Sequence, residues 1–469
     1  MNKKAKISIG ILIIIAIIFI PFSCAKHKNQ NYNYRETNGN EEKLKNDQEE
    51  EKIEPRIEED EEKPISYQET TPTIEKKIVS TNTENSNKKA ETVTNIKNNI
   101  KQTNAIEEEI NTTEEIIGKD GQFVYRRTNK KEINLLRYIG TETEITIPSK
   151  YDGYKVLSIG NSNTSEEGNL LNFFDETENN TITSVKIESG IKSIEDRTFY
   201  NCTGLVNLDI PNSIEIYGDE AFYNCQNLIG NIKIPTNLKY LGKGAFYNCE
   251  KLTGNLIIPE GITEIKAATF RNCKSLDGYI KLPNTLKKIE RVAFTKCEKL
   301  SGDLVIPDSV ESIGEWAFQH CNNITTLTLS KNIKVIEKYT FSYCEKLAGN
   351  LIIPEGVTKI GEGAFGYSPK LTGDLIIPDS VEEIEKFAFL GDTGFNGIIK
   401  LSNNLKKITE ASFGRCSNLV GDLIIPDSVE EIEKDAFRED YNLDGNLIIK
   451  NQNIILGTNV FRDCKKLKM

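Results

Sequence analysis

The residues best suited to chemistry in this chain are its cysteines, which are regularly spaced. The chain has ten cysteines. Cys24 stands alone near the N-terminus, and the other nine are separated by 23 or 24 residues or by multiples of 24: Cys202, Cys225, Cys249, Cys273, Cys297, Cys321, Cys344, Cys416 and Cys464. Three kinds of chemistry fit such a series, namely disulfide exchange, soft-metal binding and nucleophilic catalysis.

The positions of these cysteines favour a structural role. Nine is an odd number, and the positions one interval before and after Cys416 hold Asp392 and Asp440. Stacked repeats would bring neighbouring cysteines near disulfide distance, so one or two bridges remain an alternative. A soft-metal stack is a weaker alternative, because no close Cys-x-x-Cys pair is present. We predict a buried column of small apolar thiols.

Histidine and charge narrow the possible functions further. The only histidines are His27 and His320, too few for a Cys-His or Ser-His-Asp site or for a His-rich metal site. Carboxylates are plentiful, yet no single pair stands out as a catalytic pair. The net charge of −11 argues against a nucleic-acid partner, which requires clustered Lys and Arg. We expect a protein that is not an enzyme and has no metal, cofactor or nucleic acid.

The N-terminus has the layout of an export signal. Lys3, Lys4 and Lys6 precede an apolar run over 7–20, which is shorter than a bilayer span usually needs. Ser23 followed by Cys24 looks like a bacterial lipobox, although Pro21 stands where leucine is usual. We predict a signal peptide over 1–23 and lipid attachment at Cys24. An ordinary cleaved signal and an uncleaved anchor are alternatives.

A polar tether is predicted over 24–118. This segment is rich in Glu, Lys, Asn and Thr, with an acidic cluster over 47–62. Such a composition buries too little apolar surface to offset the entropy of ordering. As a flexible chain it would reach roughly 50–60 Å from a membrane.

The rest of the chain is organised by a repeated phenylalanine. Intervals are 24 residues, except two of 23, along the series Phe199, Phe222, Phe246, Phe270, Phe294, Phe318, Phe341, Phe365, Phe389, Phe413, Phe437 and Phe461. The two shorter units lack a glycine found before the strand in the others, so a bulge or tight bend is predicted at that glycine.

Each unit reads as a short strand, a second short segment and a turn. Leu256 and Ile258 share one face of a strand and Ile257 points the other way, while Phe246 and Cys249 lie on one face of a helical turn. No unit buries its apolar residues alone, so the units must stack. We predict a mostly β solenoid over 191–469 with about 12–13 units of 23–24 residues, parallel short strands and one short helical turn per repeat.

The motif Ile313-Gly314 followed by Ala317-Phe318 and Cys321, with Ile-Pro at the strand end, resembles the BspA-like family of leucine-rich-repeat surface proteins. The segment 119–190 looks like the N-terminal capping segment and first repeat of such domains, interrupted by a polar loop that carries Phe173 and Phe174. The resemblance implies a secreted or surface-anchored protein, often an adhesin, without specifying a ligand.

The outward residue of each strand is the candidate binding position, because it varies while the inward positions hardly do. In a curved solenoid these residues line an extended face. The candidates are Ile257, Lys281, Val305, Thr328, Ile352, Ile376, Lys400 and Ile424, with Asp209, Lys233 and Ile448 in the same series. An alternative is that β-branched residues simply favour strands.

Two further features of the repeats are predicted to be structural. A neighbouring series of Asn231, Asn255, Asn350, Asp374 and Asp422 is interpreted as a hydrogen-bonding ladder and not as a calcium site. The acidic pairs over 382–383 and 430–431 are interpreted as solvated faces, with attraction of a basic partner as the alternative.

These features together predict a membrane-tethered extracellular protein at the cell surface or outer membrane, which binds a protein or glycan in adhesion to host or neighbouring cells. The alternative is an envelope-organising protein whose solenoid ends associate with other copies. At the C-terminus, the lysines over 465–468 either blunt an open edge or form part of such a contact.

Overall fold

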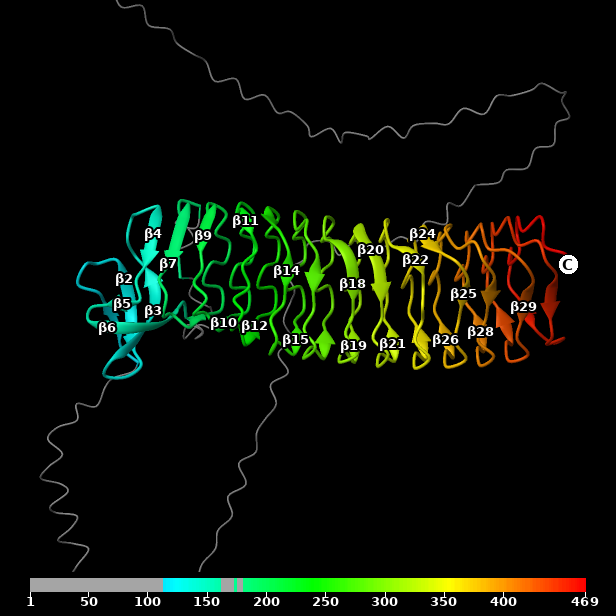
Figure 1. Ribbon diagram of the computed structural model, residues 1–469, viewed down its shortest axis with the longest axis horizontal. Coiled ribbons are helices and arrows are strands. Elements are labelled where there is room, and N and C mark those ends of the chain that lie inside the picture. Colours follow the sequence, from blue (N-terminus) through cyan, green and yellow to red (C-terminus); the bar gives the residue numbers. More distant parts are fainter. Residues whose placement is uncertain (1–112, 162–172, 175–179) are drawn as a thin grey trace, which may run out of the picture. The chain divides into compact units, whose positions relative to one another are not determined.

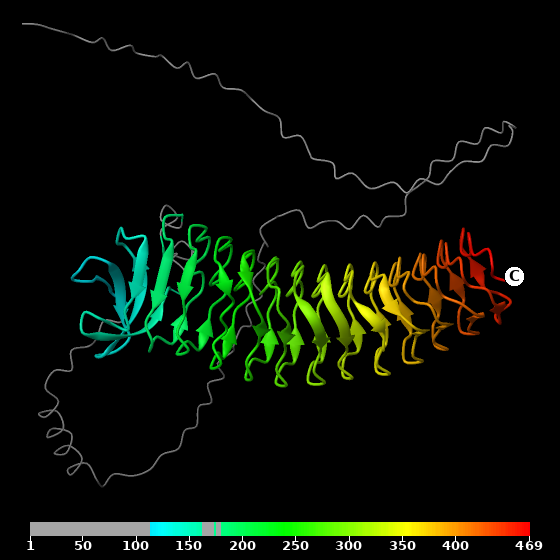
Figure 2. The ribbon, with the colours of Figure 1, turned by 45° about the horizontal axis from the view of Figure 1, so that its top comes forward.

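The computed structural model describes residues 113–161, 173–174 and 180–469. The predicted signal peptide, Cys24 and nearly all of the predicted tether lie outside these residues. The described residues form a solenoid of short strands, with about 13 turns stacked along one axis (Figures 1 and 2). The predicted parallel-strand solenoid is therefore confirmed.

Six strands form the N-terminal end: β1 (Glu115–Ile117), β2 (Phe123–Arg127), β3 (Glu132–Tyr138), β4 (Glu144–Ile147), β5 (Lys150–Tyr151) and β6 (Tyr154–Ile159). β1, β2 and β3 pair antiparallel, and β3 then pairs parallel with β6, which leads into the stacked turns. β1 lies within the segment 24–118, which we assigned to the tether. Its backbone pairs with β2, so these residues belong to the folded domain. The folded part of the chain thus begins before residue 119.

After this end, each turn contributes to two rows of mostly parallel strands. The first strand row contains β4, β7 (Ser184–Ile187), β9 (Asn207–Asp209), β11 (Gly230–Asn231), β13 (Leu252–Thr253), β14 (Leu256–Ile257), β16 (Ile280–Lys281), β18 (Ser301–Val305), β20 (Asn323–Thr328), β22 (Ala348–Asn350), β24 (Lys370–Thr372), β25 (Leu375–Ile376), β27 (Ile399–Lys400), β29 (Leu423–Ile425) and β31 (Leu447–Ile449). At the C-terminal end, the Leu447 N–H donates to the Lys468 carbonyl, so the last residues start a further rung.

The second strand row contains β8 (Ser193–Ile194), β10 (Ile216–Tyr217), β12 (Tyr240–Leu241), β15 (Glu264–Ile265), β17 (Lys288–Ile289), β19 (Ser312–Ile313), β21 (Val335–Ile336), β23 (Lys359–Ile360), β26 (Glu383–Ile384), β28 (Lys407–Ile408), β30 (Glu431–Ile432) and β32 (Ile455–Leu456). Most of these strands have one outward and one inward residue, because successive side chains of a strand alternate in direction.

The core is a column of stacked phenylalanine rings. From Phe199 to Phe461, neighbouring ring centroids are 4.9–5.9 Å apart and their planes differ by 5–19°. Phe174 lies 5.6 Å from Phe199, so it supplies the ring of the first turn. The loop that interrupts the first repeat therefore still contributes its aromatic residue to the core.

The segment around each phenylalanine differs from the predicted helical turn. The described residues contain no helix, and the residues two before and two after each phenylalanine of this column from Phe199 onwards have positive φ, as in Ala268 (57°) and Asn272 (62°) around Phe270. Left-handed residues at both positions prevent an α-helix. The N–H groups instead bond to the next turn: Ala268 donates to Arg291 O at 3.2 Å and Asn272 to Thr295 O at 2.9 Å.

The glycine that distinguishes 24-residue from 23-residue units marks an irregularity, as predicted. Gly302 has φ of 80°, and the pairing of β18 with β20 shifts register between Gly302 and Asp303. β20 belongs to a 23-residue unit, so the shift absorbs the difference in length between neighbouring turns.

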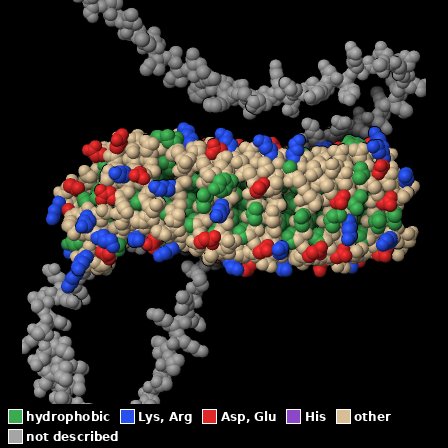
Figure 3. Space-filling model, viewed as in Figure 1, with side chains coloured by type: hydrophobic (Ala, Val, Ile, Leu, Met, Phe, Trp, Pro, Cys, Tyr) green, Lys and Arg blue, Asp and Glu red, His purple; other side chains and the backbone are tan. Residues whose placement is uncertain are grey.

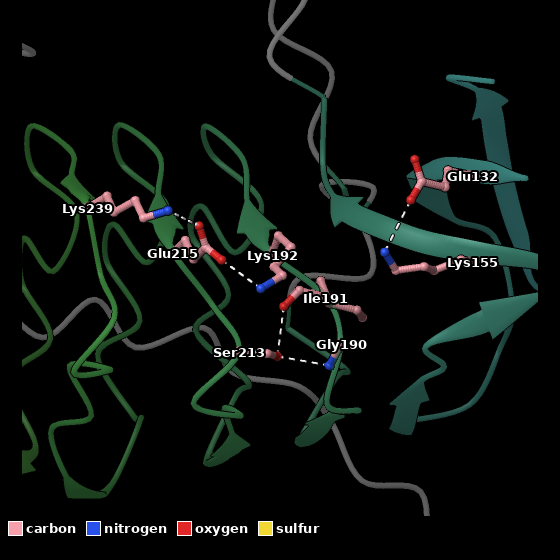
Figure 4. A network of polar contacts seen from close by, with 8 residues as sticks. All are labelled: Glu132, Lys155, Gly190, Ile191, Lys192, Ser213, Glu215 and Lys239. Atoms are coloured by element: carbon pink, nitrogen blue, oxygen red, sulfur yellow. Dashed lines mark hydrogen bonds and ion pairs between the residues drawn. The ribbon is translucent and has the colours of Figure 1, made fainter.

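Hydrogen bonds between side chains, and between side chains and backbone, connect the first turns of the solenoid (Figure 4). The Glu215 carboxylate receives hydrogen bonds from Lys192 and Lys239, one turn before and one turn after it, each at 2.6 Å. These two contacts lower the Glu215 pKa to about 2. Ser213 Oγ donates to the Ile191 carbonyl at 2.8 Å and accepts from the Gly190 N–H at 2.9 Å.

Candidate binding face of the solenoid

The outward positions of the first strand row carry all of the candidate binding residues. All eight are exposed, as are Asp209, Lys233 and Ile448 in the same series. The inward neighbours are buried, as with Leu256 and Ile258 on either side of Ile257. Figure 3 shows hydrophobic side chains among charged ones on the side of the solenoid seen there. The predicted alternation of strand faces is confirmed, whereas ligand contact at these residues remains a proposal.

Five of the exposed residues form what we call the isoleucine stripe: Ile352, Ile376, Ile398, Ile424 and Ile448. Their exposed fractions run from 38% to 72%, with Ile352 the most exposed. The sequence analysis missed Ile398, which lies two residues before the candidate Lys400. It also missed the exposed Tyr279 at the matching place in another turn. The 24-residue period predicts both positions, because Ile398 lies one period after Asp374 and Tyr279 lies one period after Asn255.

The Asn and Asp series beside this stripe is a hydrogen-bonding ladder, as predicted. The Asp374 carboxylate accepts from the Ile398 N–H at 2.9 Å, and the Asp422 carboxylate from the Asn446 N–H at 2.6 Å. Asn255 Oδ1 accepts from the Tyr279 N–H in the same way at 3.1 Å. These side chains therefore connect each turn to the next one.

The outward positions of the second strand row differ from those of the first. Lys359 contacts Glu383 and Glu385 of the next turn at 3.1 and 2.6 Å, and Lys407 contacts Glu431 and Glu433 at 2.9 and 2.6 Å. These contacts raise the pKa of both lysines. The acidic pairs that we interpreted as solvated faces thus take part in ion pairs along the solenoid, and exposed pairs of this kind stabilise a fold only slightly.

The cysteines form the predicted buried column. All nine described cysteines are buried. Eight thiols donate to the carbonyl of a phenylalanine in the preceding turn, as Cys273 does to Phe246 O at 3.1 Å, and the Ser368 hydroxyl does the same to Phe341 O at 3.1 Å. Burial raises the pKa of the Cys273 thiol well above its ordinary value, so it is a poor nucleophile and metal ligand.

Two aspartates occupy this buried column in place of cysteine. Asp392 and Asp440 are fully buried. Asp392 Oδ1 accepts from the Ser368 N–H at 2.7 Å, but its Oδ2 has no hydrogen-bond partner in the described part of the chain, nor does either carboxylate oxygen of Asp440. Burial raises the pKa of both carboxyl groups well above the ordinary value.

Within residues 113–161, 173–174 and 180–469, His, Cys, Asp and Glu form no group that would hold a metal ion. The same residues include no helix long and apolar enough to cross a bilayer.

Comparison with known proteins identifies the repeat. The model of the BspA type leucine rich repeat region matches residues 172–300, 275–396 and 348–468, which together span more than half of the chain. The chain belongs to the BspA-type leucine-rich-repeat family. This family is generally non-enzymatic and forms repeat scaffolds for interaction with other molecules.

Two solved structures are similar to this chain. A leucine-rich repeat protein from Bacteroides ovatus is 24% identical with a TM-score of 0.57, over 74% of this chain and 91% of that chain. A leucine rich cell surface protein from Faecalibacterium prausnitzii is 25% identical with a TM-score of 0.47, over 75% and 93%. No curated protein matches the chain. The likeness to the Bacteroides structure shows a shared fold, and the binding chemistry must be argued from the residues of this BspA-type solenoid.

Proposed function

We propose that this chain is a membrane-tethered extracellular scaffold of the cell surface or outer membrane. In this proposal, the first strand row binds a protein or glycan and thereby mediates adhesion to host or neighbouring cells. The contrast between the two rows carries the proposal. Between residues 352 and 448, isoleucines are exposed along the first row, whereas Lys359 and Lys407 of the second row pair with glutamates of the next turn. Exposed apolar runs often mark contact sites.

A binding array tests this proposal. The purified full chain is applied to matrix proteins, serum proteins and glycans, and a saturable ligand is expected. Ile352→Lys with Ile376→Lys should weaken binding at least about tenfold, since aliphatic contact is replaced by charge. Lysine already occupies this position at Lys281 and Lys400, so the variant should fold.

Val335→Lys is the matched control, because it introduces lysine at an outward position of the second row. Equal weakening by the control would contradict a binding site on the first row. Absence of any ligand, together with a mass that rises with concentration, would instead support the self-associating alternative. Ile455 and Leu456 at the end of the second row are exposed and available for such a contact.

The tether is tested at Cys24, which lies outside the described residues. Cys24→Ala should abolish incorporation of labelled fatty acid and release the chain from the membrane fraction, because a lipid chain is what retains an exported lipoprotein there. Ser23→Ala serves as the control and should leave labelling in place. Unchanged labelling of Cys24→Ala would refute lipid attachment at this residue.

A further inference from the structure

The charges around the isoleucine stripe are strongly biased. Five turns carry the isoleucine stripe. In each turn, three positions form or flank the stripe: the strand position of Ile376, the position two residues before it and the position three residues after it. Carboxylates occupy five of these positions, namely Glu355, Asp374, Asp379, Asp422 and Asp427. The only cation is Lys400. All five carboxylates are exposed. They flank Ile352, Ile376 and Ile424, whereas the turn of Ile398 has Lys400 at the strand position.

The same positions in the earlier turns have the opposite tendency. From Lys186 to Asn284, the same three positions of five turns hold the cations Lys186, Lys233 and Lys281 and only two carboxylates, Asp209 and Glu260. One of these carboxylates, Asp209, lies 3.8 Å from the Lys233 ammonium. The acidic margin begins at the turn of the exposed Val305, which Asp303 and Asp308 flank, so it is not a uniform consequence of the negative chain.

Two of the carboxylates keep an oxygen available to a ligand, whereas Asp379 accepts from Asn403 with both of its oxygens. Asp374 and Asp422 each use Oδ1 to bond the next turn, and their Oδ2 atoms make no hydrogen bond to any other described residue. Their exposed oxygens can accept hydrogen bonds from ammonium or guanidinium groups, which are stronger than neutral ones. The isoleucines between them can bury aliphatic side chains at about 25 cal/mol per Å².

We propose that the isoleucine stripe binds a cationic amphipathic segment of a protein partner, with its aliphatic side chains on the isoleucines and its lysines or arginines on the flanking carboxylates. This inference rests on the proposed function and names the partner class. Four intervals between turns of about 4.8 Å make the stripe roughly 19 Å long. A helix of about 13 residues matches this length. An acidic glycan would be repelled by the carboxylates, and a neutral glycan would offer them no positive charge.

The probe is a labelled 14-residue peptide of leucine and lysine in amphipathic helical order, titrated into the full chain and followed by fluorescence anisotropy. We expect saturable binding that weakens as salt is added, because exposed charges are screened within about 10 Å at 0.1 M ionic strength. A peptide with glutamate in place of lysine should bind at least about tenfold more weakly.

Neutral variants locate the site. Glu355→Gln, Asp374→Asn, Asp422→Asn and Asp427→Asn together should weaken peptide binding at least about tenfold. Asn255 occupies the position equivalent to Asp374 in an earlier turn, and its side chain accepts a hydrogen bond from the next turn. Asparagine at position 374 should therefore preserve the fold. Circular dichroism and unfolding midpoints verify this.

The matched control removes the same charge from the second row: Glu382→Gln, Glu383→Gln, Glu430→Gln and Glu431→Gln. Peptide affinity should change less than about twofold. Equal weakening by both variants would show general attraction to an acidic chain and overturn the proposal, as would equal binding of the glutamate peptide. If an array ligand is lost with Ile352→Lys and Ile376→Lys while the lysine peptide fails to bind, the proposed function stands and the cationic partner does not.

Discussion

A variant with Asp392→Asn and Asp440→Asn is expected to be more stable than the wild-type chain at neutral pH, by about 1–3 kcal/mol per site. At this place in other turns, a thiol or hydroxyl donates to a phenylalanine carbonyl of the preceding turn, as Cys416 does to Phe389 O at 3.2 Å. A protonated carboxyl or an amide can donate there, whereas a carboxylate cannot. Ionised Asp392 and Asp440 therefore hold buried charge with too few hydrogen-bond donors, since Asp392 accepts from the Ser368 N–H through one oxygen only.

The sign of the pH dependence follows from the raised pKa of both groups. When the folded-state pKa exceeds the unfolded value of about 3.8, the folded state binds more protons over the window between them. The contribution of these aspartates to stability is fully present below the unfolded pKa and is lost as pH rises towards the folded pKa. The difference between variant and wild type should therefore be small at about pH 4 and large at about pH 8.

Urea unfolding at several pH values measures this difference. The titratable groups around the two aspartates are Cys344, Cys416, Cys464 and Glu439, and all are retained in the variant, so their effects cancel. Asp427→Asn, at an exposed carboxyl of the same turn as Asp440, is the control and should change stability little at any pH. A pH-independent gain in the double variant would contradict our account of buried ionisation.

Phe294→Ala is expected to destabilise the solenoid by about 3–5 kcal/mol. The ring of Phe294 stacks on Phe270 at 5.4 Å and on Phe318 at 4.9 Å, so its removal leaves a cavity bounded by two neighbours. Each turn of a solenoid contacts only the adjacent turns. The two halves of the variant should therefore unfold separately, in two urea transitions.

Phe461→Ala provides the same chemical change at the end of the column. Phe461 is only partly buried, and the ring stacked on it is Phe437, at 5.9 Å. Its loss should cost less than about half as much as that of Phe294, without splitting the transition. Circular dichroism during urea unfolding makes the comparison. Equal losses at both positions would contradict the idea that stacking on both faces determines the contribution of each ring.

The repeat period and the alternation within each strand determined the fold and the orientation of the candidate residues. Both are local properties, since direction alternates along a strand and recurs every 24 residues, so Leu256 faces inward and Ile257 outward in any stack of such turns. The sequence by itself therefore predicted the buried cysteines and the exposed candidates of the first row. It also predicted the irregularity at Gly302.

Only the tertiary structure decided features that depend on the adjacent turn. The left-handed residues beside Phe270 are held by carbonyls of the next turn, which local spacing does not reveal, and a helical turn was predicted there instead. The pairing of Lys359 with Glu383 and the place of Phe174 in the core likewise depend on which side chains stacking brings together. The same holds for the carboxylate oxygens of Asp392 and Asp440 that find no donor among the described residues. The physical reason is that hydrogen bonds and ion pairs require neighbours in space, and in a solenoid those neighbours lie about 24 residues away in the sequence.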